Sequence, residues 1–153
     1  MTEVEQKLTA INQDIEQLLQ GLGQEGLLDD QFAQLMQLQD DSNPDFVAEV
    51  VELYFEDSAG KLEKLDAKLA APVPDFNEVD QLVHQFKGSS ASFGAQGLAS
   101  LCVQLRDGCM RGDRQGCQQL LQEVKRNFNT LKGRLEIFMQ LETQRKLLIG
   151  GGQ

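Results

Sequence analysis

Histidine, cysteine and tryptophan are scarce in this sequence of 153 residues, which contains one histidine, three cysteines and no tryptophan. The cysteines, Cys102, Cys109 and Cys117, form no CxxC pair, and any disulfide scheme leaves one of them unpaired. We therefore expect reduced, mostly buried thiols. Metal binding by these thiols would need additional ligands, so we expect neither a resident metal nor a cofactor.

Positive charge is also scarce. Fourteen Lys and Arg against 24 Asp and Glu give a net charge of -10, and only 6% of the residues are aromatic. This balance argues against a protein that binds the phosphate backbone of nucleic acid. No apolar run approaches the roughly 20 residues of a membrane span, and the acidic N-terminus does not resemble a signal peptide. We expect an intracellular, soluble protein with neither nucleic acid nor membrane as a partner.

The hydrophobic content, 41%, is too high for a disordered acidic chain. A chain of 153 residues fits a single domain, 1–153, that removes about 70% of its unfolded surface from water. Since a helical bundle of this length can close its own core, we expect a monomer.

Apolar residues recur at helical spacing throughout, and no stretch reads as a strand. The pattern predicts six helices, at about residues 2–22, 30–38, 44–71, 76–92, 95–111 and 114–146. The fold class is all-α: an up-down antiparallel four-helix bundle over about 44–146, with two additional N-terminal helices packed against it. The glycine-rich end, about 147–153, is predicted to be a flexible tail.

Three local signals support these boundaries. Thr2-x-x-Glu5 is a capping box for the first helix. Asn43-Pro44 is a start signal for the third, with a capping residue followed by proline. Asp75, after a proline-rich break, caps the fourth helix.

The long third helix contains one feature that the sequence leaves unexplained. Its expected apolar stripe consists of Phe46, Val47, Val50, Leu53, Tyr54, Leu62, Leu65 and Leu69. Gly60 interrupts this helix without an evident reason.

The single histidine lies on the exposed face of the fourth helix. On a helical wheel of residues 76–92, one arc holds the apolar residues and is the buried face: Val79, Leu82, Val83, Phe86 and Ser90. His84 lies almost opposite this arc, so its imidazole should face solvent. An isolated histidine of this kind is usually an ordinary surface residue. Here the neighbouring residues favour a functional role instead.

Lys87 and Gly88 follow His84 at i+3 and i+4, on the same side of the helix. Glycine inside a helix costs roughly 1 kcal/mol relative to alanine, and an exposed position offers no packing reason for it. Close approach of a large partner to His84 explains the missing side chain, and Ala91 extends the low surface by one turn. Lys87 can neutralise an anion on the ring, although solvation alone also explains a lysine.

Neutral imidazole is a competent nucleophile toward phosphorus, and phosphoimidazole retains a good leaving group. Phosphoryl transfer requires in-line access and positive charge, usually with magnesium. No magnesium ligands are evident beside His84. We therefore expect a phosphate-receiving site whose Mg²⁺ is supplied by the partner.

The run His84-Gln85-Phe86-Lys87-Gly88-Ser89-Ser90-Ala91-Ser92-Phe93-Gly94-Ala95 resembles the signature of plant-type histidine-containing phosphotransfer (HPt) proteins. The similarity continues upstream through Phe32, Gln34, Leu35, Gln37, Leu38, Gln39, Asp40 and Asn43-Pro44-Asp45-Phe46-Val47, and it covers about residues 28–140. The last seven residues match no family pattern.

The resemblance implies that His84 is phosphorylated, that Lys87 lies beside the phosphoryl group and that Gly88 admits a receiver domain. Some plant relatives carry asparagine in place of the histidine and cannot accept phosphate. Partner contacts are expected at Gln85, Ala91, Leu28, Phe32, Met36 and Arg106. Plain packing against the bundle is the alternative for the apolar members of this set.

The hypothesis is a phosphorelay carrier that takes phosphate from the receiver aspartate of a hybrid histidine kinase and passes it to a response regulator. Without a nucleotide motif, it should not phosphorylate itself from ATP. The plant resemblance implies cytokinin signalling and a cytoplasmic and nuclear location. The alternative is a non-catalytic helical adapter that binds receiver domains and competes with true carriers; a metal-dependent hydrolase lacks a ligand cluster.

Overall fold

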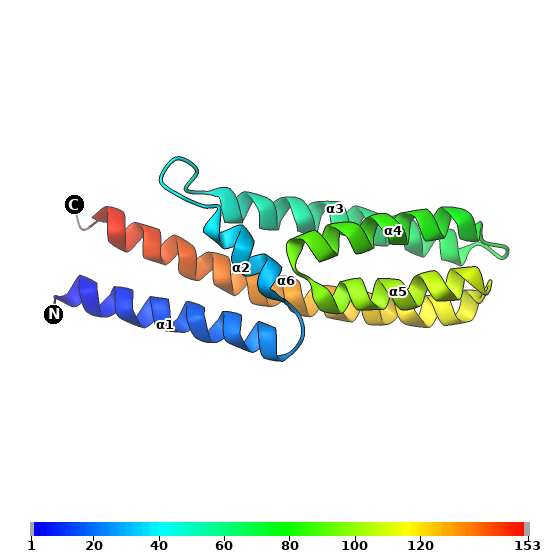
Figure 1. The fold of residues 1–153 in the computed structure, drawn as a ribbon, viewed down its shortest axis with the longest axis horizontal. Helices are drawn as coiled ribbons and strands as arrows, with labels where there is room; N and C mark the ends of the chain where they lie inside the picture. Colours follow the sequence, from blue (N-terminus) through cyan, green and yellow to red (C-terminus); the bar gives the residue numbers. More distant parts are fainter. Residues whose placement is uncertain (1, 152–153) are drawn as a thin grey trace.

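The computed structural model describes residues 2–151, and within them it contains six α-helices and no strand. The helices are α1 Glu3–Gln24, α2 Asp30–Gln37, α3 Phe46–Ala70, α4 Phe76–Phe93, α5 Gln96–Met110 and α6 Arg114–Gly151. All six predicted helices are therefore present, in the predicted order (Figure 1).

The four helices α3 to α6 run alternately up and down and form the predicted bundle (Figure 1). The 38 residues of α6 make it about 57 Å long at 1.5 Å per residue. Its first half completes the bundle, and its second half pairs with α1, while α2 crosses to contact α3 and α4. The single long helix thus joins the bundle to the N-terminal helices.

Two helix starts follow the sequence signals closely. Thr2 and Glu5 form the reciprocal capping box of α1. The Asp75 side chain caps α4 by accepting hydrogen bonds from the backbone N–H groups of Asn77 and Glu78.

Gly94 ends α4 and holds α2 in place. Its φ of 99° lies in the left-handed region that favours glycine. A Cβ there would approach the backbone nitrogen of Phe32 to 2.6 Å, so α2 also requires the missing side chain. The Gly94 carbonyl accepts a hydrogen bond from the Asp29 N–H at 2.8 Å. The end of the histidine helix is therefore tied to the start of α2.

Two predicted boundaries are corrected. Asn43-Pro44 does not begin α3; the helix starts at Phe46, and its N-cap residue Asp45 makes no side-chain hydrogen bond. Asn43 instead lies in a turn, where its amide donates to the Leu38 carbonyl at 3.1 Å.

At the other end, α6 does not stop near Lys146 but continues to Gly151. The expected tail, 147–153, is thus helical as far as Gly151. Residues 152 and 153 lie outside the described part of the chain.

The core is continuous and contains an aromatic cluster where α2 meets the bundle. The Tyr54 and Phe93 rings stack with centroids 4.2 Å apart, and Phe32 contacts Phe93 at 5.3 Å and Phe138 at 5.8 Å. The Tyr54 hydroxyl shares a 2.7 Å hydrogen bond with the Ser90 hydroxyl, which satisfies both buried groups. These contacts fix the C-terminal part of α4, the helix that bears His84, against α3.

The three cysteines are free and buried, as expected. Burial raises the pKa of the Cys102 thiol to about 12 and that of Cys109 to about 12. Both thiols are therefore protonated at neutral pH. In the described residues, no helix combines the length and hydropathy that crossing a membrane requires.

Candidate functional site

His84 lies near the middle of α4 with its side chain exposed, as the helical wheel predicts. The opposite face is fully buried through Val79, Val83 and Phe86, and Ser90 is buried beside them. Burial of three large apolar side chains fixes the rotation of α4 about its axis. The imidazole is consequently held outward on a rigid helix.

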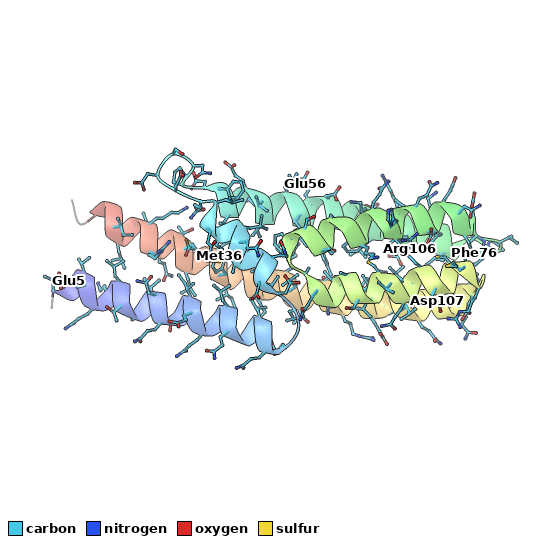
Figure 2. The ribbon with its side chains drawn as sticks, in the orientation of Figure 1. Glu5, Met36, Glu56, Phe76, Arg106 and Asp107 are labelled. Atoms are coloured by element: carbon cyan, nitrogen blue, oxygen red, sulfur yellow. The ribbon has the colours of Figure 1, made fainter. Side chains whose placement is uncertain are left out.

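Arg106 of α5 contacts the imidazole. Its Nη1 lies 2.9 Å from His84 Nδ1, and its Nε donates to Asp80 Oδ1 at 3.0 Å. A second contact joins Arg106 Nη2 to Asp80 Oδ2 at 3.4 Å. Figure 2 shows Arg106 between α4 and α5. The structure thus confirms that Arg106 lies near the histidine.

Asp80 is a site residue that the sequence analysis did not identify. It precedes His84 by one helical turn, and its carboxylate orients the guanidinium from below. The hydrogen bond that Arg106 donates to Asp80 is the main cause that raises the pKa of Arg106, and desolvation opposes it. The sequence offered one signal for this role, an acidic residue four positions before the only histidine. It could not reveal the partner of that acid, because Arg106 lies on another helix.

Gly88 and Lys87 complete this face of α4. An added Cβ at Gly88 would meet no atom within 4 Å, so no contact inside the protein requires glycine there. Lys87 is half-buried and forms no ion pair with any residue of 2–151. Gln85 and Ala91 are exposed, as expected. The surface beside the imidazole is therefore low, open and free of a carboxylate partner for Lys87.

Gly60, unexplained by the sequence, lies on α3 next to this face. It lines a shallow groove with Leu82 and Gln85 of α4, and an added Cβ would meet nothing within 4 Å. The missing side chain keeps the groove open. No group of three or more His, Cys, Asp or Glu side chains among residues 2–151 is placed to hold a metal ion.

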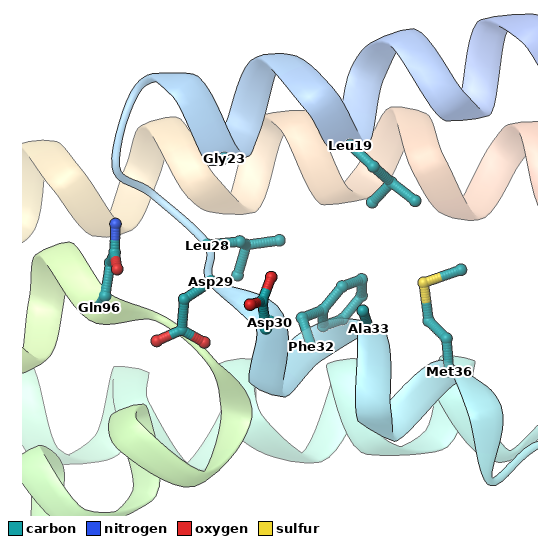
Figure 3. Close-up of a pocket in the computed structure, with 9 residues that line it drawn as sticks. All are labelled: Leu19, Gly23, Leu28, Asp29, Asp30, Phe32, Ala33, Met36 and Gln96. Atoms are coloured by element: carbon teal, nitrogen blue, oxygen red, sulfur yellow. The ribbon is translucent and has the colours of Figure 1, made fainter.

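For two of the three N-terminal apolar residues expected to contact a partner, the alternative, packing against the bundle, is what the structure shows. Leu28 is 4% exposed and Phe32 is 2% exposed, because Phe32 packs into the aromatic cluster. Met36 is half-buried and lines a pocket of about 400 Å³ together with Leu19 of α1 (Figure 3). None of the residues that line this pocket belongs to the His84 face.

The apolar surface next to the site is instead a groove between α3 and α4. Its apolar wall is formed by Leu35, Val50 and Leu53, and Ser89 and Ser92 of α4 form the other side. Leu53 is 68% exposed, which corrects its place in the buried stripe. A helical wheel places Leu53 about 160° from Val51, so the signal was present in the sequence.

Comparison with known proteins agrees with this geometry. Residues 49–138 match the family model described as the Hpt domain. The chain is 48% identical over 128 residues to histidine-containing phosphotransfer protein 1 of Arabidopsis thaliana, covering 84% of this chain and 82% of the relative. It is also 41% identical to a rice protein named pseudo histidine-containing phosphotransfer protein 1, over 80% of this chain and 66% of the relative.

Among solved structures, a histidine-containing phosphotransfer protein from rice superposes with a TM-score of 0.85 at 39% identity. The match covers 91% of this chain and 98% of the rice chain. The all-helical fold, the family model and the identity to plant relatives lead to one conclusion. The chain belongs to the family of histidine-containing phosphotransfer proteins.

Proposed function

We propose that this protein is a phosphorelay carrier that accepts a phosphoryl group on His84. The observation that carries the proposal is an exposed imidazole on a rigid helix, beside a helical glycine that no internal contact requires. Its donors are the receiver domains of hybrid histidine kinases, and its acceptors are response regulators. Family membership supports the carrier role.

The nitrogen that reacts is Nε2. Nδ1 is engaged by Arg106, whereas Nε2 makes no hydrogen bond to any residue of 2–151. Because Nδ1 accepts from Arg106, the proton of the resting ring lies on Nε2 and leaves to solvent as the ring reacts. The Nε2 electron pair forms the bond to phosphorus, the P–O bond of the receiver's aspartyl phosphate breaks, and its electron pair returns to the aspartate. Lys87 stabilises charge on the phosphoryl oxygens, and the receiver supplies the Mg²⁺.

The receiver is proposed to dock over Gly88, Ala91 and Gln85 and to extend into the apolar groove beside Leu53. This surface is continuous with the His84 face, because α4 contributes to both. Leu28 and Phe32 are buried and are therefore not proposed as partner contacts. Met36 is at most a peripheral contact.

A non-catalytic adapter is the second candidate, since one relative carries the name pseudo histidine-containing phosphotransfer protein. Replacing His84 with Gln distinguishes the two functions. For a carrier, His84→Gln keeps receiver binding in calorimetry and loses all phosphoryl uptake. Equal restoration of pathway output by the wild type and by His84→Gln, in cells that lack the protein, would establish the adapter instead.

The wider setting is proposed from the plant resemblance of the sequence. We propose that the protein acts as a monomer in cytokinin signalling and occupies cytoplasm and nucleus. It depends on a phosphorylated receiver rather than on ATP. Incubation with ATP labelled at the γ-phosphate, without a kinase, should give no labelled protein, and incorporation of the label would refute this point.

A further inference from the structure

The contact between Arg106 and His84 has a defined direction. A guanidinium has five N–H donors and no acceptor, so Arg106 donates and Nδ1 accepts. A neutral imidazole carries its proton on one nitrogen only. With the Nδ1 lone pair engaged, the proton of the resting ring lies on Nε2.

The same contact suits a phosphorylated ring. When Nε2 carries the phosphoryl group, Nδ1 of the neutral ring keeps its lone pair and can still accept from Arg106. Protonation of Nδ1 would require this hydrogen bond to break and would place a cationic ring against a guanidinium. We infer that Arg106 is a positioning residue that sets the tautomer of His84 and, by occupying Nδ1, lengthens the life of the phosphohistidine.

The chemistry of hydrolysis explains why Nδ1 matters. Water oxygen forms a bond to phosphorus, the P–Nε2 bond breaks, its electron pair stays on Nε2, and the water proton goes to solvent. If Nδ1 is protonated, the ring leaves as neutral imidazole. If Nδ1 is not protonated, the ring must leave as an imidazolate anion, which is a much poorer leaving group. A donor that occupies Nδ1 therefore slows hydrolysis.

Asp80 makes the arrangement specific. It binds Arg106 through Nε and Nη2, which leaves Nη1 directed at His84. The planar guanidinium serves both partners at once, and a lysine ammonium cannot reproduce this fork. The contact with His84 Nδ1 therefore requires the planar geometry of the arginine side chain as well as its charge. The inference rests on the proposed phosphorylation of His84.

The test uses the full chain and four variants. Arg106→Met removes the donor and keeps an apolar stem, Arg106→Lys keeps the charge without the fork, and Asp80→Asn weakens the orientation of Arg106. Arg111→Met is the matched control, because Arg111 is the C-cap residue of the same helix, α5, and its one salt bridge within residues 2–151 is with Asp107. Circular dichroism establishes that each variant is folded.

Two readouts apply to each variant. Imidazole ¹⁵N NMR of the unphosphorylated protein should show the proton on Nε2 in the wild type and in Arg111→Met, and a mixture of tautomers in Arg106→Met. After phosphorylation with phosphoramidate, a small phosphoryl donor, intact mass should show phosphate loss about three- to tenfold faster in Arg106→Met. Arg106→Lys and Asp80→Asn should fall between these limits.

A proton on Nδ1 in the wild type, or equal phosphate lifetimes in the wild type and Arg106→Met, would overturn the inference. The proposed function is tested separately, because phosphoramidate needs no receiver. Failure of every receiver to phosphorylate the wild type refutes the carrier, whatever the lifetimes show.

Discussion

Gly88 offers the sharpest separation of stability from function. Glycine in an exposed helix interior is destabilising by about 0.5–1 kcal/mol relative to alanine. Since an added Cβ at Gly88 meets no atom within 4 Å, no clash offsets this gain. Gly88→Ala should therefore raise the free energy of unfolding by about 0.5–1 kcal/mol, and Tm by about 1–4 °C for a domain of this size.

The rate of phosphoryl transfer to His84 should fall, whereas stability rises. A longer side chain beside the imidazole holds the receiver's aspartyl phosphate away from Nε2, and a displacement of about 1 Å from the reacting geometry costs on the order of 100-fold in rate. Gly88→Gln should therefore keep full helicity and lower the rate of phosphoryl transfer about 100-fold. Gly88→Ala, with one methyl group, should give a smaller loss.

Gly133 supplies the matched control. It is exposed in the interior of α6, an added Cβ there also meets nothing within 4 Å, and α6 does not contact α4. Gly133→Ala and Gly133→Gln should give the same gain in stability and leave transfer unchanged. Urea denaturation and transfer from a phosphorylated receiver, followed by intact mass, measure the two effects. Transfer by Gly88→Gln at the wild-type rate would refute the steric reasoning.

Three further predictions concern Lys87, the α3–α4 groove and the buried thiols. Lys87→Ala should slow phosphoryl uptake or shorten the phosphohistidine lifetime without abolishing either, and unchanged values in both assays would leave the lysine with a solvation role only. Leu53→Asp should weaken receiver binding in calorimetry while leaving Tm nearly unchanged, because Leu53 is exposed; native affinity would exclude the groove as a docking surface. In reducing buffer, the free energy of unfolding should be level from neutral pH to about pH 8.5 and fall above it. The reason is that thiols of the unfolded chain ionise near that pH, whereas burial raises the pKa of Cys102 and Cys109 to about 12. Urea denaturation at several pH values would show a slope of about 1.4 kcal/mol per pH unit for each such thiol, and a level profile through pH 10 would contradict it.

The helices could be predicted because their signals are local. The capping box at Thr2, the Asp75 cap and the apolar stripes depend only on residues within a few turns, and all six helices are present, with α1 and α4 starting where their caps predict. Asn43-Pro44 predicted the wrong start for α3, because the Asn43 side chain makes hydrogen bonds within its own turn instead of capping the helix. A local start signal cannot reveal that competing set of hydrogen bonds.

Burial of α2 was beyond the sequence pattern. Phe32 is buried by rings at Phe93 and Phe138, which lie on α4 and at a distant part of α6. The surplus of apolar residues in this segment was apparent, but which of them face the core depends on how α2 crosses the bundle. Leu53, in contrast, could have been placed correctly from its helical angle alone.

In the candidate site, too, some residues could be predicted from local sequence and others could not. His84, Lys87 and Gly88 lie on one helix, so their common face could be predicted from their spacing. The pair formed by Asp80 and Arg106 joins α4 to α5, and its geometry depends on how these helices pack. The link that this pair makes to Nδ1 therefore emerged only from the structure.

The central claim is that His84 carries phosphate, and one measurement tests it most directly. The wild-type protein is incubated with a phosphorylated receiver domain and Mg²⁺, and the intact chain is then analysed by mass spectrometry before and after acid treatment. The account predicts one acid-labile phosphate, mapped to His84 and absent from His84→Gln. No uptake from several competent receivers, or an acid-stable phosphate at another residue, would contradict it.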